Sequence, residues 1–113
     1  MMNSPETKKR LLQIAEVLEK GWCQWDYAVS PLGKVFDQDT IMAATPGVDR
    51  FCLRGALLRV SGGFDRVVYA RIYEVLLSVG YLSLTAFNDA PGRTQAEVVK
   101  LVRKAAEEEA NDD

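Results

Sequence analysis

The sequence predicts a mainly α-helical fold: a compact bundle of four main helices and one short helix, with a small β-hairpin near residues 25–37. Apolar residues recur at spacings of three and four along several segments, which is the helical period. Serine, threonine, proline and glycine stand between these segments, where they begin and end helices. One short stretch alternates apolar and polar residues instead, as a strand does. The 113 residues fit one domain, which we expect to span residues 1–106.

The first helix is predicted to begin at Ser4-Pro5 and to end at Gly21. Serine is favoured just before a helix, and proline suits the first helical position because its missing N–H would have no partner there. Glycine commonly follows the last helical residue. The expected buried face contains Leu11, Ile14, Ala15 and Leu18.

Residues 22–36, WCQWDYAVSPLGKVF, favour a β-hairpin or an extended loop held by its aromatic side chains. Trp25, Tyr27 and Val29 alternate with polar or small residues, and residues 30–33 form a turn signal. A lone hairpin is marginally stable, so we expect this one to pack on the helices. One helical turn is expected at residues 40–44.

A second helix is predicted to be capped by Asp49, with Phe51 as its first apolar position. Gly55 lies inside this helix, where glycine is destabilising by about 0.5–1 kcal/mol relative to alanine. We expect Cys52, Gly55 and Ala56 to form a patch of small residues that allows close contact with another helix or with the indole of Trp22.

The third and later helices have clear ends. Residues 67–79 are apolar around most of the helix, which predicts a central position in the bundle. Ser83 is predicted to cap a short helix that runs through Phe87. Thr94 and Glu97 fit a capping box at the start of the last helix, in which each side chain bonds to the backbone N–H of the other residue.

The composition excludes several chemistries. The chain has no histidine, so neither a Ser-His nor a Cys-His relay can form. Cys23 and Cys52 are the only cysteines, and two cysteines without histidine cannot complete the usual zinc site. We therefore expect no metal and no cofactor. Asp, Glu, Lys or Tyr could still serve an enzyme, but no recognisable catalytic set is present.

The charge pattern and the N-terminus indicate a cytoplasmic protein. The net charge is −2, which gives no general attraction to nucleic acid or to a membrane surface. No apolar segment near the N-terminus resembles a secretory signal. The longest uncharged run, residues 75–88, has 14 residues, whereas a membrane-spanning helix needs about 20. Both cysteines are expected to be reduced, buried thiols. Residues 107–113 are expected to form a disordered acidic tail.

A polar cluster precedes the last helix and allows two interpretations. Asn88, Asp89 and Arg93 stand among turn residues, and Arg93 carries five donors suited to a carboxylate, a phosphate or backbone carbonyls. In the first interpretation they form a structural clamp, in which Arg93 pairs with Asp89 or Asp26 or covers a helix C-terminus. In the second, these residues line a polar pocket with Gln24 and Trp25.

Three motifs carry a family resemblance: GWCQ at 21–24, CLRGAL at 52–57 and NDAPGRTQAEV at 88–98. Their order resembles a family of small bacterial and phage proteins catalogued as a domain of unknown function, with GWxQ, CLxGA and NDxxGRTxxEV motifs. The resemblance covers about residues 10–106 and implies a common fold without an activity, substrate or cofactor. Two positions depart from the pattern: Phe87 stands where the family has tryptophan, and Trp25 where it has a small residue, often glycine.

Three kinds of function fit these observations. The small size, the missing catalytic sets and the aromatic hairpin favour a protein-interaction or regulatory module, with a homodimer as a further arrangement. The alternative is a nucleic-acid-associated protein that uses Arg50, Arg54, Arg59, Arg66 and Arg71 of the second and third helices, where Arg50 and Arg54 would share a face. The third is a ligand-binding protein or an enzyme with a polar pocket at Asn88, Asp89 and Arg93.

Overall fold

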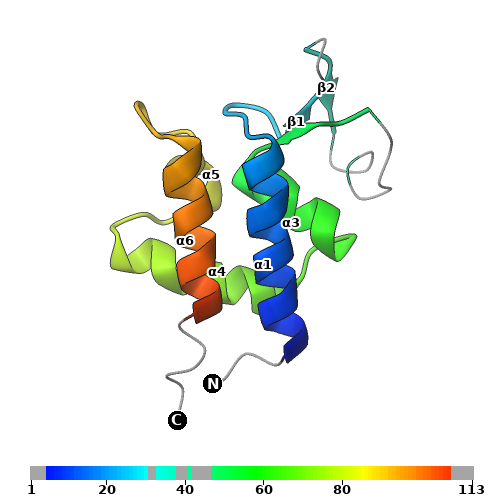
Figure 1. Ribbon diagram of the computed structural model, residues 1–113. Helices are drawn as coiled ribbons and strands as arrows, with labels where there is room; N and C mark the ends of the chain where they lie inside the picture. The colour runs from blue at the N-terminus through cyan, green and yellow to red at the C-terminus, as the bar shows by residue number, and fades with distance from the viewer. Residues whose placement is uncertain (1–4, 31–32, 38–40, 42–46, 108–113) are drawn as a thin grey trace.

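The computed structural model describes residues 5–30, 33–37, 41 and 47–107. Within these residues five α-helices and a small antiparallel sheet form one body (Figure 1). The mainly helical class with four main helices, one short helix and a hairpin is therefore confirmed. The elements are α1 (Pro5–Lys20), β1 (Ala28–Val29), β2 (Val35–Phe36), β3 (Arg50–Phe51), α3 (Leu53–Ser61), α4 (Arg66–Ser78), α5 (Leu84–Asn88) and α6 (Gln95–Glu107).

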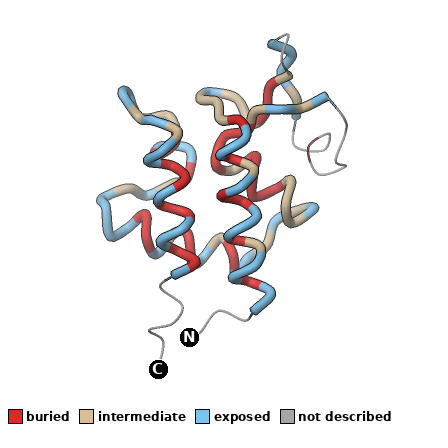
Figure 2. Tube along the Cα trace, in the orientation of Figure 1, coloured by how far each residue is buried: buried red, intermediate tan, exposed pale blue. Residues whose placement is uncertain are grey.

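The first and last helices, α1 and α6, lie side by side and antiparallel, and they form the most extensive helix pair (Figure 1). Buried residues recur along one side of each helix, as the predicted apolar spacing requires (Figure 2). The side-chain amide of Gln95 donates to the carbonyl oxygens of Leu18 at 2.7 Å and Glu19 at 3.1 Å, so α6 caps the end of α1. Arg103 adds an ion pair with Glu19 at 2.6 Å.

The predicted helix starts are confirmed at two places. Ser83 Oγ accepts a hydrogen bond from Ala86 N at 2.9 Å and caps α5. At α6, Thr94 N donates to Glu97 Oε1 at 2.9 Å, and Glu97 N donates to Thr94 Oγ1 at 3.2 Å. This reciprocal pair is the expected capping box, and it also lowers the pKa of Glu97, chiefly through the bond from the Thr94 backbone.

The hairpin is present but shorter than residues 25–37. β1 pairs with β2, and it also pairs with β3 on its other edge, giving the strand order β2-β1-β3. Residues 25–27 lie outside the strands. Of the helical turn expected at residues 40–44, only Ile41 is described, and it is helical and buried. The tail after residue 107 lies outside the described residues, and Glu107, which was expected to begin the tail, ends α6.

The second helix begins later than predicted. Asp49 does not cap it, because Arg50 and Phe51 form strand β3 and the cap of α3 is Cys52. The apolar spacing that includes Phe51 also fits a buried strand residue, and pairing with β1 decides in favour of the strand. Phe51 N donates to Gly21 O at 3.1 Å, which ties the strand to the end of α1.

The predicted central position of residues 67–79 is wrong. Helix α4 buries one face, and its remaining apolar residues are exposed or half-buried. Apolar residues around a helix suggested burial on all sides, but only one side of α4 packs on the other helices. Large apolar side chains are exposed on α4 and in the segments just before and after it. They are Phe64, Val67, Leu77, Val79 and Leu82.

Gly55 is required by a close backbone contact, although the partner differs from the predicted ones. A Cβ at this position would overlap the carbonyl oxygen of Tyr27, in the segment that leads into β1. Neither another helix nor the indole of Trp22 is the nearest group. Cys52 N donates to the same Tyr27 oxygen at 3.0 Å, so the start of α3 is pressed directly against this segment.

We predict that Gly55→Ala lowers the free energy of unfolding by about 2 kcal/mol, because the added methyl group must displace the Tyr27 carbonyl. At an unconstrained helical site the same change would be stabilising by about 1 kcal/mol. Urea denaturation followed by circular dichroism measures the difference. Ala70→Gly, at an exposed position of α4, measures how much the exchange of alanine and glycine changes helix stability in this protein when no close contact is involved. A Gly55→Ala variant more stable than the parent would contradict the contact.

Candidate functional site

The three sequence motifs meet around the side chain of Asn88, at the end of α5. Its Oδ1 accepts hydrogen bonds from Trp22 Nε1 at 2.7 Å and from Leu53 N at 3.0 Å. Its Nδ2 donates to Cys23 O at 3.1 Å and to Asp89 Oδ1 at 2.8 Å. Each motif therefore contributes at least one partner to a single amide, which is 1% exposed.

The amide of Asn88 has no hydrogen-bonding capacity left for a ligand. A carboxamide offers two acceptor directions and two N–H donors, and all four are used within the protein. Two donors face the oxygen and two acceptors face the nitrogen, so the network itself fixes the orientation of the amide. The side chain joins the loop after α1, the start of α3 and the end of α5.

Gln24 and Asp89 extend this network to the neighbouring loop. Gln24 Nε2 donates to the carbonyl oxygens of Asn88 at 3.1 Å and Ala90 at 3.2 Å, which the end of α5 leaves without helical partners. Asp89 Oδ1 accepts from Trp25 N at 2.9 Å. The loop at residues 22–25 is thus held against α5 by side chains from both segments.

Arg93 lies over the C-terminal turn of α5, which is one of the three arrangements expected for a structural clamp. Its Nε donates to Phe87 O at 2.8 Å, and its guanidinium carbon lies 3.8 Å from the Phe87 ring centre and 5.2 Å from that of Tyr81. Glu97 lies 3.6 Å from the guanidinium. The predicted pairing with Asp89 or Asp26 is not among its contacts.

The two cysteines are free thiols in an unreactive setting. Burial raises the pKa of Cys23 to about 12 and that of Cys52 to about 11. Cys52 Sγ accepts a hydrogen bond from Gly55 N at 3.2 Å and so caps α3. Because the thiolate is the nucleophilic form, both cysteines are poor nucleophiles at neutral pH.

Trp25 differs from the rest of the cluster. Its side chain is 70% exposed, and its backbone has φ 77°, in the left-handed region that favours glycine. Among the described residues it is the only non-glycine with positive φ. The hydrogen bond from its N–H to Asp89 holds this conformation. Neighbouring Trp22, by contrast, is half-buried and bonded to Asn88.

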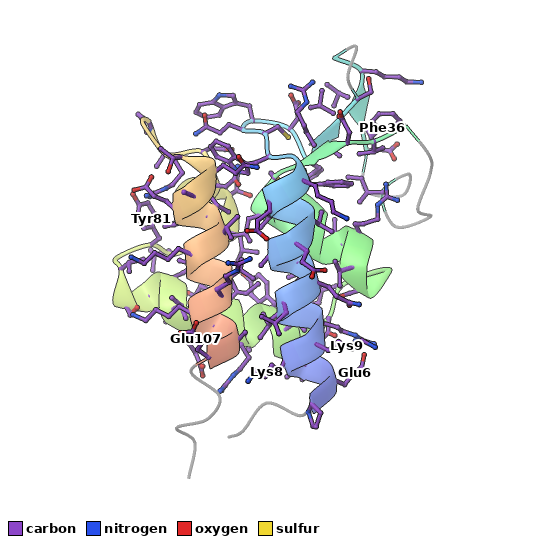
Figure 3. All side chains as sticks on the ribbon, in the orientation of Figure 1. Glu6, Lys8, Lys9, Phe36, Tyr81 and Glu107 are labelled. Atoms are coloured by element: carbon purple, nitrogen blue, oxygen red, sulfur yellow. The ribbon has the colours of Figure 1, made fainter. Side chains whose placement is uncertain are left out.

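Beside Trp25 lies an open hollow of about 860 Å³ between the hairpin and α5. Asn88 and Asp89 are among its lining residues, whereas Arg93 is not. Figure 3 shows Phe36, which lines the hollow, and Tyr81, which lies beside Arg93, on opposite sides of the molecule. The full lining is Trp25, Asp26, Tyr27, Val35, Phe36, Asp37, Cys52, Thr85, Asn88 and Asp89.

Sequence reasoning missed Val35, Asp37 and Thr85 as parts of one surface. None of them stands in a motif, and the hollow exists only because the hairpin folds back beside α5. The sequence carries no local signal for such a meeting of distant segments. The expected pocket of Asn88, Asp89 and Arg93 is also divided, because Arg93 faces Phe87 and Tyr81 instead.

The arginines named for nucleic-acid binding differ from expectation at one position. Arg50 lies on β3, so it does not share a helix face with Arg54. Arg59 lies over the Phe51 ring, with its guanidinium carbon 5.1 Å from the ring centre, and Arg71 is buried. The prediction that Arg50 and Arg54 share a helix face is therefore wrong, whereas Arg54, Arg59, Arg66 and Arg71 do lie on α3 and α4.

The chain matches the family model described as a family of unknown function, DUF6197, over residues 2–108. It belongs to this family. The resemblance inferred from the motifs is thereby confirmed at the level of an uncharacterised family, and DUF6197 brings no activity to the site. No curated protein and no solved structure matches the chain at a significant level.

Both departures from the motif pattern fall on residues with distinct environments. Trp25 stands where the motif pattern predicts a small residue, often glycine, and its φ of 77° would suit glycine. Phe87 stands where the motif pattern predicts tryptophan, and its ring lies under the guanidinium of Arg93. Position 25 thus holds a large side chain in a backbone conformation unfavourable to it.

Two further observations limit the site. Within the described part of the chain, no three residues of the kinds that bind metals gather closely enough to hold an ion. None of the described helices has both the length and the apolar character needed to cross a lipid bilayer.

We predict that Asn88→Ala lowers the free energy of unfolding by about 3 kcal/mol or more, because it leaves Trp22 Nε1, Leu53 N and Cys23 O without their partner. Asn88→Asp should also be destabilising at neutral pH, since it replaces a donor facing Cys23 O and Asp89 with an acceptor. Urea titration measures both. Thr85→Ala, at an exposed position of the same short helix, is the matched control. An Asn88→Ala variant as stable as this control would refute the network's importance.

The raised thiol pKa values predict loss of stability at alkaline pH. Between the unfolded value of 9.0 and the folded values of about 11 and about 12, the native state binds more protons than the unfolded state. The thiols' contribution is therefore complete below pH 9 and is lost as pH rises through the folded values. Urea denaturation under reducing conditions at pH 8 to 10.5 should show a smaller decline for Cys23→Ala than for the parent. An equal decline of the free energy of unfolding with pH in the two proteins would contradict the raised pKa of Cys23.

Proposed function

We propose that this protein is a protein-interaction module that docks a partner through the hollow beside Trp25. The exposed, left-handed Trp25 carries the proposal. A bulky residue in this conformation costs on the order of 1 kcal/mol, and a side chain that is 70% exposed returns little of this by burial. Folding alone therefore gives no reason for a tryptophan at this position, whereas tryptophan is among the residues that contribute most to protein interfaces.

The surroundings of Trp25 support docking. Tyr27 and Phe36 are half-buried against the core, so the wall of the hollow is fixed, while Val35 is 55% exposed at its edge. Asn88, which lines the hollow, is held in place by its hydrogen bonds with Trp22 and Leu53. A rigid surface with an exposed aromatic anchor loses little conformational freedom on binding.

The other functions have weaker support. A catalytic function would draw on the carboxylates of the hollow alone, because Cys52 is held protonated at neutral pH and the amide of Asn88 is fully bonded. Nucleic-acid binding would need a continuous basic surface, whereas the carboxylates of Asp26, Asp37 and Asp89 line the hollow.

Affinity capture with the immobilised full chain tests this function. Proteins retained from a lysate of its native cells are quantified by mass spectrometry for the parent and for Trp25→Ala. We expect a defined protein to be lost with Trp25→Ala, and purified partner to bind this variant about 30-fold more weakly, the effect of losing about 2 kcal/mol at a binding hot spot. Leu82→Ala is the control, since Leu82 is 77% exposed and lies outside the hollow. Equal retention by all three proteins would overturn the proposal.

A further inference from the structure

We propose that the hollow beside Trp25 binds an arginine side chain of a partner protein. This inference rests on the proposed function, because it assigns the chemistry of the segment that docks there. Three features lead to it: the charge of the lining residues, the aromatic rings among them, and the way in which this chain binds its own arginines.

The lining residues carry negative charge only. Asp26, Asp37 and Asp89 contribute three carboxylates, and none of the lining residues is a lysine or an arginine. One oxygen of Asp89 is occupied by Trp25 N and Asn88 Nδ2. Within the described part of the chain, the carboxylate of Asp26 has no hydrogen bond or ion pair. A cationic segment would be attracted to this surface and would gain partners there.

Aromatic rings stand beside these carboxylates. Trp25, Tyr27 and Phe36 line the same hollow, and the faces of such rings attract cations. A carboxylate next to a ring face suits the planar guanidinium in particular, because it can stack on the ring and direct its N–H groups toward the acid. A lysine ammonium has the charge but lacks the planar fork.

The chain uses the same combination for its own arginine elsewhere. Arg93 stacks at 3.8 Å from the Phe87 ring centre, with Glu97 at 3.6 Å and a carbonyl oxygen at 2.8 Å. The hollow brings together groups of the same two kinds, the rings of Trp25, Tyr27 and Phe36 and the carboxylates of Asp26 and Asp89. Because the hollow is open and holds about 860 Å³, it accommodates an arginine that remains part of a peptide.

One cation of this chain lies at the edge of the hollow. The ammonium of Lys34 is 5.5 Å from the ring centre of Phe36, although Lys34 is not among the lining residues. This ammonium places a positive charge against a ring of the hollow, where it would compete with an incoming arginine. Arg50 lies on the neighbouring strand, but its guanidinium is engaged by Ser30 O at 2.8 Å and by Asp49 at 3.7 Å.

The experiment is an NMR titration of the ¹⁵N-labelled full chain with the peptide acetyl-Gly-Gly-Arg-Gly-Gly-amide. Its control is the same peptide with citrulline, which keeps the shape of arginine and removes the charge. We expect saturable shifts of the Trp25 indole N–H and the Phe36 amide with the arginine peptide, and at least about tenfold weaker binding with citrulline. Equal binding of the two peptides, or shifts confined to other surfaces, would overturn the proposal without need of any variant.

Variants of opposite expected sign sharpen the result. Asp26→Asn and Asp37→Asn should each weaken arginine binding severalfold, whereas Lys34→Gln should strengthen it by removing a competing cation. Glu16→Gln, on the exposed side of α1, controls for net charge and should change nothing. If Glu16→Gln weakened binding of the arginine peptide as much as Asp26→Asn and Asp37→Asn, the effect would be due to net charge alone, and the proposed site would be wrong.

The titration and the capture experiment fail in distinguishable ways. If a partner depends on Trp25 but arginine and citrulline peptides bind alike, the interaction function stands and the arginine assignment falls. If capture does not depend on Trp25, the proposed function falls, and the arginine assignment falls with it as a statement about a partner.

Discussion

The fold of this protein depends on one buried carboxamide. Asn88 binds the loop after α1, the first residue of α3 and its own neighbour on α5, using all four of its hydrogen-bonding positions. An apolar side chain would leave these polar partners without their hydrogen bonds, and the loss would be most unfavourable at the buried N–H of Leu53. The neighbouring contacts of Gln24 and Arg93 with α5 secure the same junction from both sides.

Close contact between backbones is the second constraint, and it explains where glycine is needed. The segment after α1 lies directly against the segment that leads into α3. A Cβ at Gly21 would overlap the carbonyl oxygen of Asp49, and a Cβ at Gly55 would overlap that of Tyr27. These contacts bring Phe51 and Trp22 alongside one another and place β3 next to β1. The hollow beside Trp25 follows from this arrangement, since its walls are the hairpin on one side and α5 on the other.

The sequence predicted what local patterns determine. Helix ends at Ser83 and Thr94 were predictable because their capping bonds join residues three apart. Strand β3 was not, because Phe51 fits both a helix face and a strand, and only pairing with distant Ala28 decides between them. The motif residues could be grouped from their unusual composition, but their partners could not: the contact of Gly55 with Tyr27 O and the bond of Trp22 with Asn88 both depend on tertiary structure. The exposure of Trp25 could not be predicted for the same reason, since the alternation of residues in a hairpin does not indicate which aromatic rings the core will cover.

The pairing of α1 with α6 has a consequence for synthesis on the ribosome. Helix α1 completes its main interface only when α6 has been made, and the bonds between residues 22–24 and 88–90 join positions 64 to 66 apart in the chain. Such nonlocal contacts slow folding because the intervening loop must close before they form. The part of the apolar face of α1 that α6 covers, beyond what α3 and α4 cover, therefore stays exposed until α6 has left the exit tunnel, so the nascent chain needs protection by chaperones until then.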